Sequence, residues 1–137
     1  MSDSTAFHIE RDEASAAYFD GARAGQLLIR SCAACGRLFP PQQRRCPDGT
    51  ELAWFPVDGA ATLITWAVDR AAPASPALLN ATGDGSVIGI VELAEGPWLN
   101  TALPGVDATM LAPGMAMQVS FLQLGDGEPV PVFVPAP

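Results

Sequence analysis

The sequence contains no lysine and a single histidine, and these two absences limit the chemistry that the chain can perform. Its seven basic residues are all arginine and face fifteen acidic ones, which gives a formal net charge of −8. This charge repels nucleic acid on average, so a nucleic-acid partner is disfavoured. The histidine, His8, lies near the N-terminus. Since a serine or cysteine nucleophile needs a base such as histidine beside it, we predict no catalytic residue and expect that the chain is not itself an enzyme.

Long apolar runs are also missing. No run approaches the roughly 20 residues of a membrane-spanning helix, and residues 1–13 are polar and acidic, unlike a signal peptide. We therefore expect a cytoplasmic protein that does not bind membranes. The three cysteines are an odd number gathered between positions 32 and 46, which favours a metal knuckle over a disulfide framework.

The rest of the composition is that of a small folded protein. Of the 137 residues, 49% are apolar and 16% are charged, as in a globular domain. The alanine-rich residues 12–24, with acids at their start, predict a short helix. Alternating and β-branched residues then predict five strands, at 62–69, 86–93, 98–103, 115–122 and 130–134. We expect a mainly β fold, in which a short N-terminal helix and a zinc-ribbon-like knuckle precede a five-stranded barrel of OB type.

A metal-binding pattern is carried by three cysteines and an aspartate, Cys32, Cys35, Cys46 and Asp48. The motif CAACG at 32–36 has the spacing of half a zinc ribbon. The motif CPDGT at 46–50 begins a second half, but glycine occupies position 49, where a fourth cysteine is expected. Two explanations stay open. Either Asp48 or a water is the fourth ligand of a weaker zinc site, or the metal has been lost and the Pro-Asp-Gly turn holds the knuckle without it.

The basic residues are concentrated in one segment. Residues 21–47 contain five arginines and no acid, so the rest of the chain carries two arginines against fifteen acidic residues, a net of −13. Guanidinium groups suit phosphates and carboxylates. Four arginines could meet the phosphates of a ligand or an acidic partner surface, or remain solvated: Arg30, Arg37, Arg44 and Arg45. Tyr18 and Phe19 are expected to pack the predicted helix against a surface of this chain or of a partner.

Several segments follow one another in a recognisable order: YFDG at 18–21, GQLLIRSCAACGRLFPP at 25–41, Cys-Pro at 46–47, ELAWFPVDGAATLITW at 51–66, VELAEGPWL at 91–99, PGMAMQVSF at 113–121 and VPVFVP at 130–135. In this order they resemble the DUF35 family, in which a rubredoxin-like zinc ribbon precedes an OB fold. The missing fourth cysteine is the clear departure. The resemblance implies a tail and short helix over 1–25, a degenerate zinc ribbon over 26–55 and an OB-fold barrel over 56–137.

The resemblance also implies a function. Members of this family accompany acyl-CoA enzymes, some of them in steroid or aromatic-acid degradation, and help to hold the CoA thioester. We therefore expect a non-catalytic accessory or scaffolding subunit of a thiolase or a thiolase-fold acyltransferase or aldolase. The alternative partner is a MaoC-like enoyl-CoA hydratase. Two readings from other classes are a single-stranded nucleic-acid-binding OB protein, which the acidic barrel disfavours, and a free-standing hydratase or thioesterase.

Overall fold

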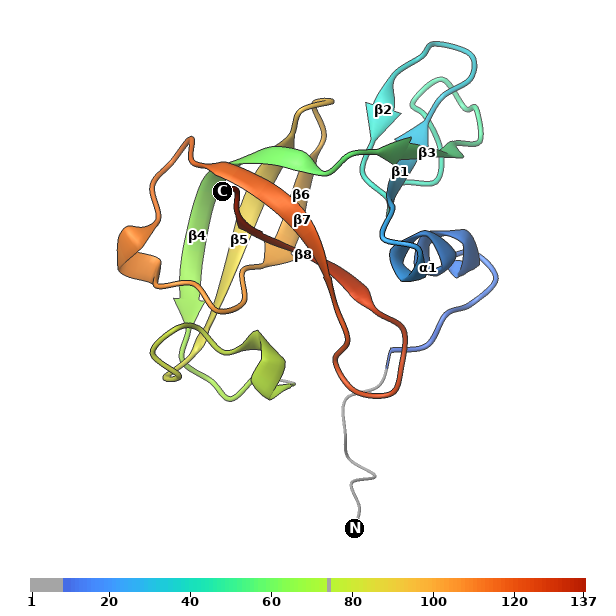
Figure 1. Ribbon diagram of the computed structural model, residues 1–137. Helices are drawn as coiled ribbons and strands as arrows, with labels where there is room; N and C mark the ends of the chain where they lie inside the picture. The colour runs from blue at the N-terminus through green and yellow to red at the C-terminus, as the bar shows by residue number, and fades with distance from the viewer. Residues whose placement is uncertain (1–8, 74) are drawn as a thin grey trace.

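The fold is described from a computed structural model, which covers residues 9–73 and 75–137; His8 lies outside this range. Figure 1 shows a curled five-stranded sheet and a smaller three-stranded sheet, with one short α-helix beside the smaller sheet. The predicted mainly β class, with a short N-terminal helix ahead of a cysteine knuckle, is confirmed. Within the described residues, no helix is long and apolar enough to cross a membrane.

Helix α1 (Ala16–Arg23) is shorter than the predicted range of 12–24. Asp12 and Ser15 form a separate turn ahead of it. The Ser15 amide donates to Asp12 Oδ1 at 2.8 Å, and the Asp12 amide donates to Ser15 Oγ at 2.9 Å. These reciprocal bonds have the pattern of a capping box, which satisfies backbone amides near the start of a helix.

The small sheet has the strand order β2-β1-β3, with both pairs antiparallel. Its strands are β1 (Leu27–Ser31), β2 (Leu38–Phe39) and β3 (Ala53–Val57). Strand β3 was not predicted from the sequence. A small separate core of four side chains lies under the turns of this sheet: Cys32, Phe39, Cys46 and Leu52.

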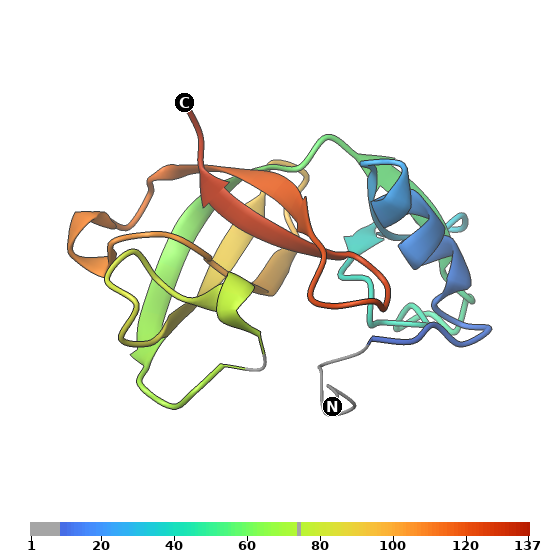
Figure 2. The same cartoon turned by 60° about the horizontal axis from the view of Figure 1, so that its bottom comes forward.

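The large sheet has the antiparallel order β6-β5-β4-β7-β8. Its strands are β4 (Ala60–Asp69), β5 (Ser86–Leu93), β6 (Trp98–Ala102), β7 (Ala116–Leu122) and β8 (Val130–Pro135), with short 3-10 turns η2 (Pro76–Leu78) and η3 (Ala108–Met110) in the connections. The five predicted strands are confirmed, and β8 lies at one edge of the sheet. The two edge strands, β6 and β8, approach each other because the sheet curls (Figures 1 and 2).

The main hydrophobic core lies inside this curl and extends under the small sheet. Its largest fully buried side chains include Phe133, Leu63 and Leu93. Leu27 and Ile29 of β1 belong to the same core, so the small sheet is packed onto the barrel. Figure 2 shows α1 and the small sheet together on one side of the barrel, with the β7–β8 loop reaching toward the helix. This packing leaves a boundary between the two sheets, which is lined by Arg30 and Trp54 of the small sheet and by Val130 and Phe133 of the barrel.

Candidate functional site

Two turns of the small sheet bring three thiols and a carboxylate together. Cys32 and Cys35 lie in the turn between β1 and β2, and Cys46 and Asp48 lie in the turn before β3. One ligand atom from each of the four residues lies within 4.8 Å of the others. The Cys35 and Cys46 Sγ atoms are 3.8 Å apart, and Cys32 Sγ is 3.6 Å from Asp48 Oδ2. The four ligands considered from the sequence therefore meet at one point, where they could hold a metal ion.

These separations fit a zinc ion. A tetrahedral ion with Zn–S bonds of about 2.3 Å and a Zn–O bond of about 2.0–2.2 Å places two sulfurs about 3.8 Å apart, and a sulfur and an oxygen about 3.5–3.7 Å apart. The distances of 3.8 Å and 3.6 Å agree with these values. Cys32 and Cys46 are buried while Cys35 and Asp48 are exposed, so the cluster lies at the edge of the protein rather than in its core.

The cluster is electrostatically crowded. Hydrogen bonds from Thr50, the backbone amide first, hold the pKa of Asp48 down at about 2, so this carboxylate is ionised. The Asp48 amide favours the Cys46 thiolate, but burial and the neighbouring Asp48, Cys35 and Cys32 side chains outweigh it and raise the pKa of Cys46 to about 12. Several acidic groups thus compete for one small space, which is the arrangement that a bound cation relieves.

Arg30, the first of the predicted arginines, is held in a stack with two aromatic rings. Arg30 of β1 and Trp54 of β3 are register partners, so their side chains share one face of the small sheet. The Arg30 Cζ atom lies 3.5 Å from the centroid of the Trp54 ring, and its Nε donates to the Pro41 carbonyl at 3.1 Å. The Tyr18 ring of α1 lies 5.7 Å from that of Trp54. Burial raises the pKa of Tyr18 to about 12, so its hydroxyl stays neutral.

The stack forms one wall of a cavity of about 620 Å³. The opposite wall comes from the barrel edges β6 and β8 and includes Val130 and Phe133. The lining is mainly apolar, and its charged members are Arg30, Arg44 and Asp12, so the two arginines outnumber the one carboxylate. Desolvation and then repulsion from Arg44 lower the pKa of Arg30, while Glu51 opposes them. Two mutually repelling arginines beside an apolar cavity indicate a place for an anionic group.

The other two predicted arginines lie away from this cavity. Arg37 is exposed, with its Cζ 5.1 Å from the centroid of the Phe39 ring. Arg45 is also exposed and donates to the Gly49 carbonyl at 3.2 Å. Both aromatic residues of α1 do line the cavity. The helix thus packs against this chain, one of the two neighbours that the sequence left open.

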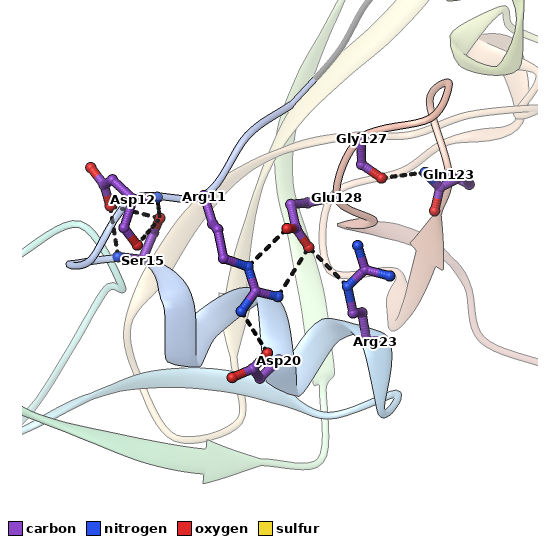
Figure 3. Close-up of polar contacts among 8 residues, drawn as sticks. All are labelled: Arg11, Asp12, Ser15, Asp20, Arg23, Gln123, Gly127 and Glu128. Atoms are coloured by element: carbon purple, nitrogen blue, oxygen red, sulfur yellow. Dashed lines mark hydrogen bonds and ion pairs between the residues drawn. The ribbon is translucent and has the colours of Figure 1, made fainter.

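An ion-pair network joins α1 to the β7–β8 loop beside the cavity (Figure 3). Arg11 Nε donates to Glu128 Oε2 at 2.8 Å, and Arg11 Nη1 pairs with Asp20 at 2.7 Å. Arg23 Nε reaches the other Glu128 oxygen at 3.0 Å. The Glu128 amide also donates to the Ile9 carbonyl at 2.8 Å. Because Ile9 lines the cavity, this network fixes one of its sides.

The network should make the helix contact sensitive to acid. Its two arginines, Arg11 above all, lower the pKa of Glu128 below the ordinary value of 4.5. A carboxylate with a lowered pKa contributes stability that is present above its unfolded pKa and is lost as the pH falls through its folded pKa. We expect Glu128→Gln to melt at a lower temperature than the wild type at pH 7. The difference should shrink once the pH drops below 4.5. Thermal melts of both proteins across this range measure it; a constant difference would contradict the assignment.

Sequence reasoning missed three residues of this region. Trp54 is only partly buried and carries the arginine stack. Arg11 and Glu128 gave no signal because 117 positions separate them. The signal that could have identified Trp54 is its position opposite Arg30 in the pairing of β1 with β3, and this pairing is known only from the structure.

Comparisons with known proteins agree with this architecture. The family model of the C-terminal OB-fold domain of ChsH2 matches residues 54–122, which confirms the predicted OB-type barrel. The solved structure of "Ltp2-ChsH2(DUF35) aldolase" has a chain that is 28% identical, with a TM-score of 0.78, over 95% of this chain and 100% of that one. A DUF35-family protein of unknown function from Sulfolobus solfataricus shares the fold at 14% identity, with a TM-score of 0.56 over 91% of this chain and 85% of that one.

A curated relative carries a second description. A "Probable enoyl-CoA hydratase alpha subunit" of Thermomonospora curvata is 33% identical over 129 residues, or 93% of this chain. The matched region is 39% of that relative's length, so the chain spans about two fifths of it. The relatives thus carry two enzyme names, an aldolase and a hydratase, and both matches cover nearly all of this chain.

Proposed function

This chain belongs to the DUF35 family of OB-fold proteins, and we propose that it is a cytoplasmic accessory subunit that binds an acyl-CoA enzyme without performing the chemistry itself. The observation that carries the proposal is the likeness, over 95% of this chain and the whole of the other, to the DUF35 chain of an aldolase structure. The partner that we propose first is a thiolase or a thiolase-fold acyltransferase or aldolase. Its substrate would be the CoA thioester of a lipid or steroid.

The cavity beside the small sheet supports a role in holding an anion. Arg30 and Arg44 give it positive charge, and Trp54 and Phe133 give it apolar walls. A CoA phosphate or a carboxylate on the partner enzyme would relieve the repulsion between the two arginines. Our proposal is that the cavity opens toward the partner and helps to hold the CoA thioester between the two proteins.

One observation favours a second candidate. The curated relative with 33% identity bears the name of a hydratase subunit, so a MaoC-like enoyl-CoA hydratase is the alternative partner. The remainder of that relative, outside the 39% that matches, has no counterpart in this chain. The same accessory role applies with either partner, because the matched part is the one that contains the small sheet and the barrel.

Zinc is the cofactor that we propose for the knuckle. Three thiols and a carboxylate within 4.8 Å of one another support it, and two of their separations have the values of a tetrahedral site. The ion would cross-link the turns at 32–36 and 46–50, as structural zinc does in small domains that have only a small hydrophobic core.

Native mass spectrometry of the chain purified gently from its host tests the accessory role. We expect recovery with a thiolase-fold or hydratase subunit, and acyl-CoA turnover only when both proteins are present. Arg30→Ala should weaken the complex about tenfold or more, since it removes a partly desolvated charge. Arg70→Ala is the matched control, because Arg70 is an exposed arginine paired with Asp84 away from the cavity. Turnover by the purified chain alone, or recovery without any such enzyme, would overturn the proposal.

A further inference from the structure

The two turns of the cysteine knuckle have the same backbone pattern. In the first turn the Gly36 amide donates to the Cys32 carbonyl at 2.8 Å, and the Cys32 amide donates to the carbonyl of Arg37, the residue after the glycine, at 2.9 Å. In the second turn the amide at position 49 donates to the Cys46 carbonyl at 2.8 Å, and the Cys46 amide donates to the Thr50 carbonyl at 2.9 Å. In both turns, therefore, the glycine amide donates to the carbonyl of the first cysteine, and the amide of that cysteine donates to the carbonyl of the residue after the glycine.

The backbone angles support this equivalence. Gly36 has φ of +78° and Gly49 has φ of +92°, the left-handed region that favours glycine. Gly49 is therefore the counterpart of Gly36. The second turn is one residue shorter, with a single residue where the first turn has two alanines. The residue directly before the glycine is the second ligand of the first turn, Cys35, and in the second turn it is Asp48.

Aspartate suits the shorter turn. A carboxylate oxygen lies one bond farther from the backbone than a cysteine sulfur, so it can reach the same point from a turn that has lost a residue. Its orientation is already fixed, because the Thr50 amide donates to Asp48 Oδ1 at 2.9 Å. The other oxygen, Oδ2, is the one that lies 3.6 Å from Cys32 Sγ. One oxygen is held by the backbone and the other faces the thiols.

From these contacts we infer that Asp48 is the fourth zinc ligand, and that the knuckle is a closed Cys3Asp site rather than a ribbon with a vacant position. The inference rests on the proposed function only in that the knuckle binds zinc. Its consequence is chemical. Three protein ligands and a water are the arrangement of catalytic zinc, whereas four protein ligands are that of structural zinc. With Asp48 as the fourth ligand, the ion is structural: it holds the two turns together and has no open coordination position for a substrate.

Cobalt(II) substituted for zinc reports the ligand set directly, through its visible spectrum. We expect the wild-type spectrum to be unchanged by added azide, because a closed site offers no exchangeable water. Asp48→Asn should shift the spectrum, make it respond to azide, and weaken zinc by about tenfold to a hundredfold in competition with a chelating dye. The matched control is Asp58→Asn: Asp58 precedes Gly59 (φ of +84°), and its Oδ1 accepts from the Ala60 amide at 3.0 Å, as Asp48 does from Thr50.

A second variant tests the equivalence of the turns. If position 49 were a lost cysteine position, Asp48→Asn with Gly49→Cys would recover tight zinc binding. We expect no recovery, because Gly49 is the counterpart of Gly36, the residue after the ligand of its turn, and its φ of +92° disfavours any side chain there. Recovery would overturn the equivalence on which the inference rests. An azide-sensitive wild-type spectrum, or an unchanged one in Asp48→Asn, would overturn the inference alone. A wild-type chain that takes up neither ion would overturn it together with the zinc proposal.

Discussion

Removing the zinc ion that we propose for the knuckle is expected to unfold residues 32–52 while the five-stranded barrel stays folded. The turns of the small sheet share a core of only four side chains, and two of these are the proposed ligands Cys32 and Cys46. Such a core cannot offset the conformational entropy of the segment. Structural zinc contributes on the order of 10 kcal/mol of binding free energy to folding in small domains, so its loss should be decisive. Hydrogen exchange read by mass spectrometry, before and after a strong chelator, measures the effect.

The barrel is the internal control for this experiment. Leu63, Val91 and Phe133 belong to the main core, which contains none of the proposed ligands. Their strands should keep their protection after chelation, and the main melting transition should remain. Arg44 and Pro41 line the cavity from inside the affected segment, so binding of the partner enzyme should fall as well. Undiminished protection of residues 32–52 in the metal-free protein would contradict a structural role for zinc.

The barrel could be predicted from the sequence because each of its strands carries a local signal. The apolar run of β5 and the alternation in β7 are visible without any knowledge of their partners. Strand β3 carries no such signal. It contains Pro56, which argues against a strand, and most of its side chains are exposed. Its pairing with β1 makes it a strand, and a pairing partner cannot be read from a short segment.

The candidate site likewise has one part that could be predicted from the sequence and another that could not. The spacing of the cysteines predicts a metal site from the sequence alone, and the structure places them with Asp48 in one cluster. The equivalence of Gly36 and Gly49 could not be seen, because counting from cysteine to cysteine assumes turns of equal length. The carbonyl partners of the two glycines remove that assumption. The ion pair of Arg11 with Glu128 could not be predicted from the sequence either, because it depends on how the helix packs against a loop that is distant in the sequence.

Gly59→Ala is expected to destabilise the whole protein by about 2–5 kcal/mol. Gly59 connects β3 to β4, so it sets how the small sheet leaves the barrel. Its φ of +84° lies in the left-handed region, which costs other residues about 1–2 kcal/mol. A Cβ there would also overlap the Val119 side chain of β7. Overpacking of this kind typically costs a further 1–3 kcal/mol or so. The midpoint of urea unfolding, compared with that of the wild type, measures the sum.

Two further variants separate strain from overlap. Gly83 has a similar φ of +77° but no atom within 4 Å of its Cβ position, so Gly83→Ala should cost only about 1–2 kcal/mol. Val119→Ala in the Gly59→Ala background should restore part of the loss, since it removes Val119 Cγ1, the atom that the new methyl group would overlap most, while Val119 Cβ remains. A double-mutant cycle gives this coupling. Equal losses at the two glycines, with no coupling to Val119, would mean that the close approach of β7 does not constrain the junction between the sheets.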